Sequence, residues 1–343
     1  MLAARLAAAL LILLALSVIV FALETVIPAD PVRALLGPSA GADALSAERH
    51  QLWLDRPLPV QYLHFLGNAL RGNLSVSLTT RRPVVRDLAA FLPATLELAA
   101  CAVLLAIVLG TTFGLVTARR RSSAIRLGFI AWASVPPFLL GLASLVVFYG
   151  RLHWFPGSGR LSAGLTPPPG PTGLLTVDSL LHGDFAALRD SAWHLVLPAF
   201  CLAVGPAVSV GRTLRSSLQS VLSEDYIRTA RAKGLSSRQI LLRHGLRNAL
   251  TAPLATLGLQ AGLLFAGVVV VESIFAWPGL GLYTARAIQG VDFPAIAGVT
   301  LVLGTAYVII NLVVDLLQSA ADPRLRRQVT RSVGRVRAAT QDY

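Results

Sequence analysis

Long apolar runs, repeated along the chain, are the feature that most limits what this sequence can fold into. The first would form a helix of about 27 Å, long enough to cross the hydrocarbon core of a membrane. Only 14% of the residues are charged, against roughly 25% in soluble domains. The sequence therefore predicts an all-α integral membrane protein with six transmembrane helices, at Leu6–Leu23, Pro93–Val116, Leu127–Tyr149, His194–Val210, Pro253–Ile274 and Ala295–Leu317.

The first run has a second interpretation, as a cleaved signal peptide. Arg5 alone supplies positive charge before the run, and Glu24-Thr25 after it offers no cleavage site flanked by small residues. We favour an uncleaved first helix.

Arginines are concentrated in alternate loops. The short loop Ala118–Arg126, the loop 212–251 and the C-terminal tail are dense in arginine, whereas the longer loops between them are poorer. Because cytoplasmic loops carry the excess of Lys and Arg, these three segments and both termini are predicted to be cytoplasmic. We divide the chain into a first helix with an external segment (1–91), a transmembrane core (92–317) and a basic tail (318–343).

Several classes of function are disfavoured. The net charge of +13 would suit nucleic-acid binding, but a soluble nucleic-acid-binding protein would not carry these apolar runs. No G-x-x-x-x-G-K-[ST] loop is present and Lys233 is the only lysine, so we expect no ATP site in this chain. The six histidines show no metal-ligand spacing, and Gly37–Gly41 (G-x-S-x-G) lies in a loop broken by prolines. We expect no metal, no cofactor and no enzymatic activity.

The polar segment Ser223–Leu250 predicts two helices joined by a tight turn. Ser223 is expected to be the N-cap of the first helix, with acidic residues following in its first turn. Gly234 is expected to end that helix in a left-handed conformation. Ser236 and Gln239 match a capping box that starts a second helix, which runs to about Leu250.

This segment has two interpretations. Its arginines are what the positive-inside rule expects of any cytoplasmic loop. A short helix with a defined end would also suit a docking element for a soluble partner.

Small residues and prolines mark places inside the predicted spans. Gly110-x-x-x-Gly114 and Gly258-x-x-x-Gly262 allow close approach of helices, and we favour packing within one chain over a subunit interface. Three prolines break predicted intramembrane helices, and with an asparagine in the last span they are candidates for lining a pathway: Pro136, Pro137, Pro206 and Asn311.

Acidic residues near the spans lie toward span ends, at Glu97, Glu272 and Asp315. They form no series of carboxylates at the middle of the membrane. This argues against a proton-coupled mechanism.

The order of motifs resembles a known family. Asp225–Leu250 (DYIRTARAKGLSSRQILLRHGLRNAL) is similar to the cytoplasmic motif, called EAA, in permeases of ATP-binding cassette importers. It matches the dipeptide/oligopeptide branch better than the general consensus. Leu54–Tyr62, Gly67–Leu74, Leu92–Leu98 and Val271–Gly281 also resemble the first permease subunit of that branch. Gln318 replaces a usual aromatic, and Pro253 falls later than the general pattern expects.

The resemblance implies a type I importer permease fold in a bacterial cytoplasmic membrane, surrounded by lipid. It implies pairing with a second, homologous permease, with two cytoplasmic ATPases that bind ATP and Mg²⁺, and with an external substrate-binding protein. It assigns coupling to the ATPases to Asp225, Tyr226, Arg228, Thr229, Ala230, Arg231, Ala232, Lys233, Gly234 and Leu235. It assigns support of that element to Arg243, His244, Arg247 and Asn248.

The sequence is compatible with more than one substrate and more than one mechanism. Permeases of this branch also carry nickel complexes or glutathione, besides di- and oligopeptides. An ion-coupled secondary transporter and a membrane scaffold without transport are the other hypotheses; the absence of a detectable inverted repeat argues against the first.

Overall fold

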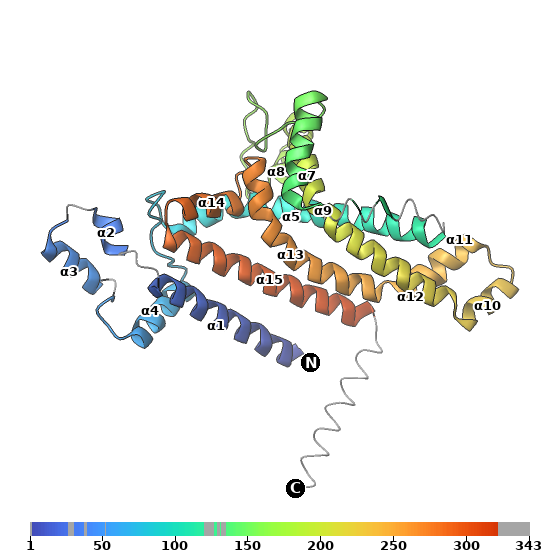
Figure 1. The fold of residues 1–343 in the computed structure, drawn as a ribbon, viewed down its shortest axis with the longest axis horizontal. Helices are drawn as coiled ribbons and strands as arrows, with labels where there is room; N and C mark the ends of the chain where they lie inside the picture. The colour runs from blue at the N-terminus through green and yellow to red at the C-terminus, as the bar shows by residue number, and fades with distance from the viewer. Residues whose placement is uncertain are drawn as a thin grey trace, which may run out of the picture.

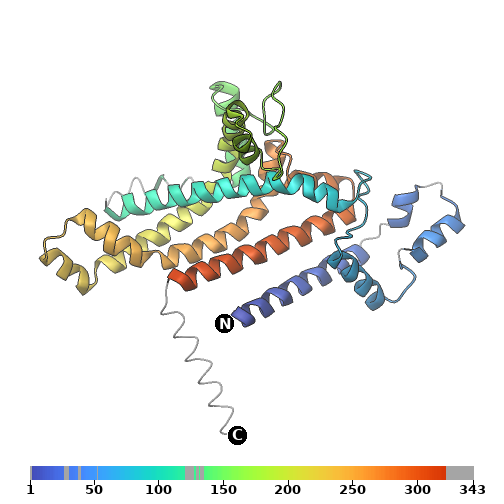
Figure 2. The same ribbon diagram turned by 180° about the vertical axis from the view of Figure 1, so that it is seen from behind.

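A computed structural model describes residues 2–26, 31–37, 40–51, 53–119, 127–128, 131 and 135–321 (Figures 1 and 2). These residues are largely helical, and an isolated β-bridge joins Val76 and Pro83. The first half contains α1 (Leu2–Val26), α2 (Pro31–Leu36), α3 (Ala42–Gln51), α4 (Leu58–Leu70), α5 (Val84–Arg119), α7 (Pro137–Ser144) and a π-helical continuation η1 (Leu145–Arg151).

The second half is also helical, and it contains the longest helix. Its elements are α8 (Leu175–Leu181), α9 (Phe185–Leu222), α10 (Asp225–Ala232), α11 (Ser237–Gln239), the π-helical η2 (Ile240–Leu246), α12 (Arg247–Ala249), α13 (Thr251–Ile274), α14 (Leu280–Gln289) and α15 (Phe293–Ala321).

Within the part of the chain that the structure describes, five helices are long and apolar enough to cross a membrane: α1, α5, α9, α13 and α15. The sequence prediction was too short for two of them, because α5 begins at Val84 and α9 extends from Phe185 to Leu222. Both helices tolerate prolines inside their length, Pro93 in α5 and Pro198 and Pro206 in α9.

The predicted third span falls partly outside the described residues. Its described part is an apolar helix of 15 residues, Pro137–Arg151, formed by α7 and η1. The count of six spans and the sides on which the termini lie therefore remain predictions. Of the predicted basic tail 318–343, residues 318–321 continue α15, and residues 322–343 lie outside the described residues.

The long helices lie side by side in one layered bundle. α5 packs along α9, α13 packs on α9, α15 on α13, and α1 lies at the edge against α15 (Figures 1 and 2). α7 projects from the middle of this bundle, whereas α10–α12 gather at one end of its long axis and α14 lies toward the other (Figure 1).

Glycines bring α5 and α9 into backbone contact, as expected of packing within one chain. A Cβ on Gly110 would lie 2.7 Å from the carbonyl oxygen of Ala207, and a Cβ on Gly114 would lie 3.0 Å from that of Gly211. The second motif works similarly, because Gly258 faces Val314 of α15.

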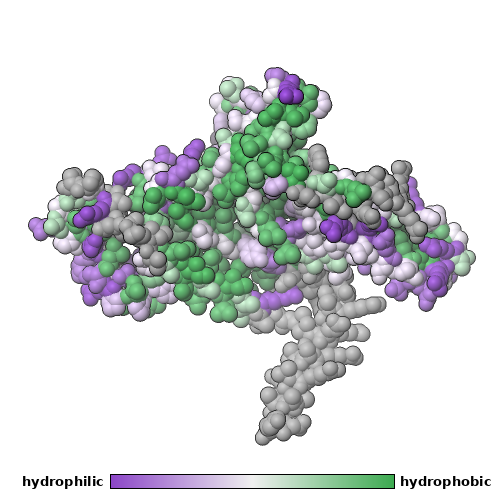
Figure 3. Space-filling view, in the orientation of Figure 1, coloured by the Kyte–Doolittle hydropathy of each residue, from purple (hydrophilic) through white to green (hydrophobic). Residues whose placement is uncertain are grey.

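The main core lies where α5, α9 and α13 meet. Leu98, Leu202, Val268, Phe275 and Trp277 are all buried there. The outer surface is apolar as well: Leu10 and Leu11 of α1 are each 68% exposed. Figure 3 shows hydrophobic surface over the middle of the bundle and over α7, with hydrophilic surface toward both ends. This pattern suits a bundle whose middle faces lipid.

Candidate functional site

Helix α10 presents most of its predicted coupling residues to solvent. Its inward face is held by Ile227 and Ala230, which pack on Ile240 together with Leu222 and Leu235. Burying an isoleucine side chain contributes about 1.5–3 kcal/mol. Of the predicted coupling residues, Ala230 is buried and Leu235 half-buried, and the exposed ones are Asp225, Tyr226, Arg228, Thr229, Arg231, Ala232, Lys233 and Gly234.

The end of α10 is a Schellman motif, as the sequence predicts. Gly234 has a φ of 83°, and its N–H donates to the carbonyl of Arg231 at 2.9 Å. The N–H of Leu235 donates to the carbonyl of Ala230 at 3.3 Å, and the two side chains pack in the same cluster. These two hydrogen bonds and the apolar contact define the motif. A Cβ on Gly234 would meet nothing within 4 Å, so its left-handed backbone conformation, and not crowding, is what favours glycine here.

The second helix starts as predicted, with the capping box. Gln239 donates its N–H to Ser236 Oγ at 3.3 Å, and the Ser236 N–H donates to Gln239 Oε1 at 2.9 Å. The helix then continues through η2 and α12 to Ala249, with its middle turns wound as a π-helix. The prediction of one helix ending near Leu250 is confirmed, but its π-helical winding was not foreseen.

The start of α10 differs from the prediction. Glu224, not Ser223, is the N-cap, and the Glu224 side chain makes no capping hydrogen bond. Ser223 instead ends α9, where its hydroxyl donates to the carbonyl of Ser220 at 2.7 Å. α9 extends to Leu222, so Ser223 is already committed to the preceding helix.

The support residues lie on the second arm, and one of them contacts α10. Asn248 donates to the hydroxyl of Tyr226 at 3.2 Å and to the carbonyl of His244 at 2.9 Å. His244 is half-buried, whereas Arg243 and Arg247 are exposed. Asn248 therefore joins the two arms.

The whole element is seated on the last turns of α9. Leu214 and Leu218 of α9 are buried against Leu241 and Ala249. Gly245 faces the side chain of Leu218 at 3.4 Å from its ideal Cβ. Movement of α10 would therefore be transmitted to α9 through a packed apolar contact.

The predicted pathway residues are only partly brought together. Pro137 and Pro206 line an open cavity of about 400 Å³ between α7, α9 and α13. Its polar lining comes from Ser209, Arg212 and Gln260. Pro136 precedes α7 as its N-cap. Asn311, on α15, donates to the carbonyl of Tyr307 at 2.9 Å and does not line this cavity.

A buried polar junction on α5 was missed by the sequence reasoning. Thr95 donates its hydroxyl to Glu272 Oε1 at 2.7 Å and accepts the N–H of Leu280 at 2.7 Å. Glu272 also accepts the N–H groups of Gly281 at 2.7 Å and Leu282 at 3.1 Å. We call Thr95 and Glu272, together with Ala94 and Glu97 of α5, the α5 junction.

This arrangement explains why two of the sequence motifs meet. In Leu92–Leu98, Ala94 accepts the indole N–H of Trp277 at 3.0 Å. In Val271–Gly281, a Cβ on Gly281 would lie 2.5 Å from the Cα of Val269, so the close turn excludes a side chain. The signal available in the sequence was a carboxylate in each motif, but the sequence did not show which donors the two carboxylates would meet.

A second polar group fixes the end of α14 and the start of α15. Asp292 accepts hydrogen bonds from Ser77 Oγ and from the N–H groups of Thr79 and Ala295. Burial opposes ionisation, yet these hydrogen bonds hold the pKa of Asp292 below its ordinary value. Within the described residues, no group of three His, Cys, Asp or Glu side chains gathers to hold a metal ion.

The comparisons with known proteins agree with this arrangement. The profile of the family "Binding-protein-dependent transport system inner membrane component" matches residues 102–327, and that of the associated N-terminal region matches residues 1–99. The chain is 44% identical over 314 residues to the "Probable D,D-dipeptide transport system permease protein DdpB" of Escherichia coli (strain K12), covering 90% of this chain and 92% of that protein.

Two further relatives cover a similar share. The "Di/tripeptide transport system permease protein DppB" of Pseudomonas aeruginosa (strain UCBPP-PA14) is 41% identical over 321 residues, covering 91% of this chain and 94% of that protein. The "Dipeptide transport system permease protein DppB" of Escherichia coli (strain K12) is 36% identical over 326 residues, covering 91% and 94%.

Proposed function

The chain belongs to the family of binding-protein-dependent transport system inner membrane components, and from this premise we propose that it is the permease subunit of an ATP-driven importer of di- and oligopeptides. The observation that carries the proposal is the similarity to permeases named for dipeptides over about nine-tenths of both chains. The setting is the cytoplasmic membrane of a bacterium, with both termini and α10 on the cytoplasmic side.

The chain acts with partners. A second, homologous permease completes the pathway, an external binding protein delivers the peptide, and two cytoplasmic ATPases bind the ATP and Mg²⁺. The cavity beside Pro137 and Pro206 lies between α7, α9 and α13, where its polar groups, Arg212 and Gln260, suit a solute with charged and amide groups. It supports the proposal as one wall of the pathway.

Helix α10 is the coupling helix. Its exposed face offers Tyr226, Arg228, Arg231 and Lys233 to a groove on an ATPase, while Ile227 anchors it to the chain. Closure of the ATPase pair would move α10, and the seating of Leu218 and Leu241 would carry that movement into α9. The coupling arises only if the ATPase contacts α10 differently in its two states.

Uptake of a labelled dipeptide tests the proposal in cells that carry the whole importer but lack the chromosomal copy of this gene. The variant Gly234→Leu is expected to accumulate in the membrane and to lose most of the uptake, while ATP hydrolysis continues. Its matched control is Gly234→Asn, because asparagine tolerates the left-handed conformation. Normal uptake by Gly234→Leu would contradict the coupling role.

Two outcomes would replace the proposal. Uptake by this chain alone, driven by a proton or sodium gradient without ATP, would make it a secondary transporter. Uptake of a nickel chelate or of glutathione, with none of dipeptides, would keep the machinery and change the substrate.

A further inference from the structure

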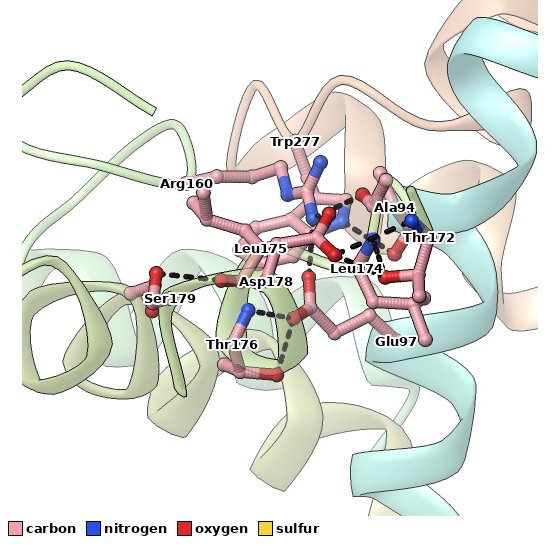
Figure 4. Close-up of polar contacts among 12 residues, drawn as sticks. Ala94, Glu97, Arg160, Thr172, Leu174, Leu175, Thr176, Asp178, Ser179 and Trp277 are labelled. Atoms are coloured by element: carbon pink, nitrogen blue, oxygen red, sulfur yellow. Dashed lines mark hydrogen bonds and ion pairs between the residues drawn. The ribbon is translucent and has the colours of Figure 1, made fainter. Parts of the chain in front are cut away.

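The α5 junction also anchors the segment between η1 and α8, and it does so through one ion pair. Arg160 Nη2 lies 2.5 Å from Glu97 Oε2, although the two residues are 63 positions apart. The other carboxylate oxygen of Glu97 accepts the N–H of Thr176 at 2.7 Å and the Thr176 hydroxyl. Figure 4 shows Arg160 and Thr176 reaching Glu97 from different sides. The carboxylate thus holds the loop and α8 together on α5.

Arg160 contacts three separate parts of the chain. Besides Glu97, it donates to the carbonyl of Gly173 at 3.2 Å, and its guanidinium lies 5.7 Å from the ring centroid of Trp277. Its Nε is buried and has no hydrogen-bond partner among the described residues. The side chain as a whole is 16% exposed, so water reaches part of it. The Nη2 atom of Arg160 therefore has two hydrogen-bond acceptors, whereas its Nε has none among the described residues.

The loop covers a polar surface of α8. Thr172 donates its hydroxyl to Asp178 at 2.7 Å, and Gly170 approaches the same carboxylate so closely that a Cβ would collide with it. Ser179, the next residue on α8, is fully buried. Thr172 and Gly170 of the loop thus cover the Asp178 carboxylate, while the proline-rich tip of the loop, around Thr166, is exposed.

The Glu272 side of the junction differs from the Arg160 side. Glu272 is fully buried and accepts from one hydroxyl and two backbone N–H groups, so moving it would leave three donors unpaired. Lifting Arg160 would instead hydrate an Nε that now has no partner. Opening would take one donor from Glu97, which keeps the N–H and the hydroxyl of Thr176, so it would cost less than moving Glu272.

The junction is also linked to the coupling helix. α5 and α9 are in backbone contact at Gly110, Gly114 and Gly211, and α9 leads to α10. A displacement of α10 would therefore be felt along α5, where Glu97 lies.

We propose that Arg160 is a positioning residue that latches the external loop Leu152–Leu174 onto α5, and that the latch opens during the transport cycle. The inference rests on the proposed function. In this structure the latch is closed, with Glu97, Gly173 and Trp277 as its contacts. Opening would uncover the polar face of α8 at the outer side of the permease, where a peptide arrives.

Accessibility of a cysteine at a buried position of α8, next to the Asp178 that the loop covers, tests the latch. Ser179→Cys is a small change at a fully buried site, and Thr166→Cys marks the exposed tip. The whole importer in right-side-out membrane vesicles is treated with a membrane-impermeant maleimide. Labelling is measured at rest and with peptide-loaded binding protein outside and ATP inside. The unaltered chain, which retains Cys101 and Cys201, supplies the background.

The latch predicts a change at one site only. Labelling of Ser179→Cys is expected to rise about tenfold on turnover, which corresponds to an open population that grows from about 1% to about 10%, while Thr166→Cys is labelled equally in both conditions. Combining Ser179→Cys with Arg160→Gln is expected to give fast labelling already at rest. The matched control is Arg189→Gln, which removes an exposed arginine near the start of α9 and leaves the latch intact.

Two results would overturn the inference. One is protection of Ser179→Cys that is equal at rest and during turnover; this measurement needs no change at Arg160, so it stands even if Arg160→Gln fails to accumulate. The other is that Ser179→Cys remains protected from labelling at rest when it is combined with Arg160→Gln. Peptide uptake is measured in the same vesicles. If the unaltered importer shows no ATP-dependent uptake, the proposed function is contradicted, and not only the latch.

Discussion

Helix α10 rests on its neighbour through two buried side chains, Ile227 and Ala230, and is otherwise exposed. Helix α14, at the other end of the bundle, begins beside a fully buried carboxylate and buries Leu280, Tyr283 and Ala287 in a cluster with α5 and α15. α10 is shaped by hydrogen bonds between residues close in sequence. The start of α14 is held by Thr95 and Glu272, which come from two other helices.

The difference shows that one chain can contain a buried helix that stabilises the bundle and an exposed helix that is available to contact a partner. An exposed helix with a defined end keeps its shape through its own caps, so its outer face is free to bind a partner. A turn buried among helices is held by groups that have no access to water. Substitutions around α14 should therefore reduce stability, and those on α10 should reduce transport more than stability.

The largest effect is expected for Glu272→Ala. It leaves two backbone N–H groups and the Thr95 hydroxyl without their buried acceptor, which should cost about 3 kcal/mol or more. Thermal unfolding in detergent and the amount of protein in the membrane measure this. Glu224→Ala is the control, because that side chain makes no capping bond. A Glu272→Ala protein as stable as the original would refute the support role of the junction.

Ile227→Ala tests the anchor of α10. Loss of a fully buried side chain there should cost about 2 kcal/mol, confined to this end of the bundle. Hydrogen exchange should become faster in α10 and remain unchanged in α14. Equal acceleration at both ends would show that the two regions unfold as one unit.

Ser236→Ala removes one half of the capping box and should cost about 1 kcal/mol. Faster hydrogen exchange is expected at the start of the second arm, with little change elsewhere. The neighbouring exposed serine provides the control, Ser237→Ala, which leaves the box intact. Identical exchange in the two variants would show that the cap contributes nothing.

Tyr226→Phe should have the smallest effect on stability, about 0.5 kcal/mol, because its bond to Asn248 is exposed. A double-mutant cycle with Asn248→Ala measures that contact alone, and the two substitutions should be non-additive. A coupling energy well above this value would mean that the two arms depend on this hydrogen bond more than on their apolar contact.

Much of the segment Ser223–Leu250 could be predicted from sequence. Gly234 and the pair Ser236–Gln239 act through hydrogen bonds that span at most a few residues, so the motif and the structure coincide. Ser223 was assigned wrongly because a serine before two acidic residues is typical of an N-cap. In the structure α9 extends to Leu222, so Ser223 is the C-cap of α9 and Glu224 is the N-cap of α10. The prediction from hydropathy also made α5 and α9 too short, because the ends of both helices lie outside the apolar run but are still helical.

The sequence by itself determined that this is a helical membrane protein, that Gly234 and Ser236 cap two of its helices, and which family its motifs resemble. These properties depend on composition, periodicity and neighbours along the chain. Only the tertiary structure decided that Glu97 meets Arg160 and that Glu272 meets Thr95, across 63 and 177 positions. No local pattern specifies such partners, because they are chosen by how the helices pack, and a buried carboxylate must then take whichever donors the packing brings to it.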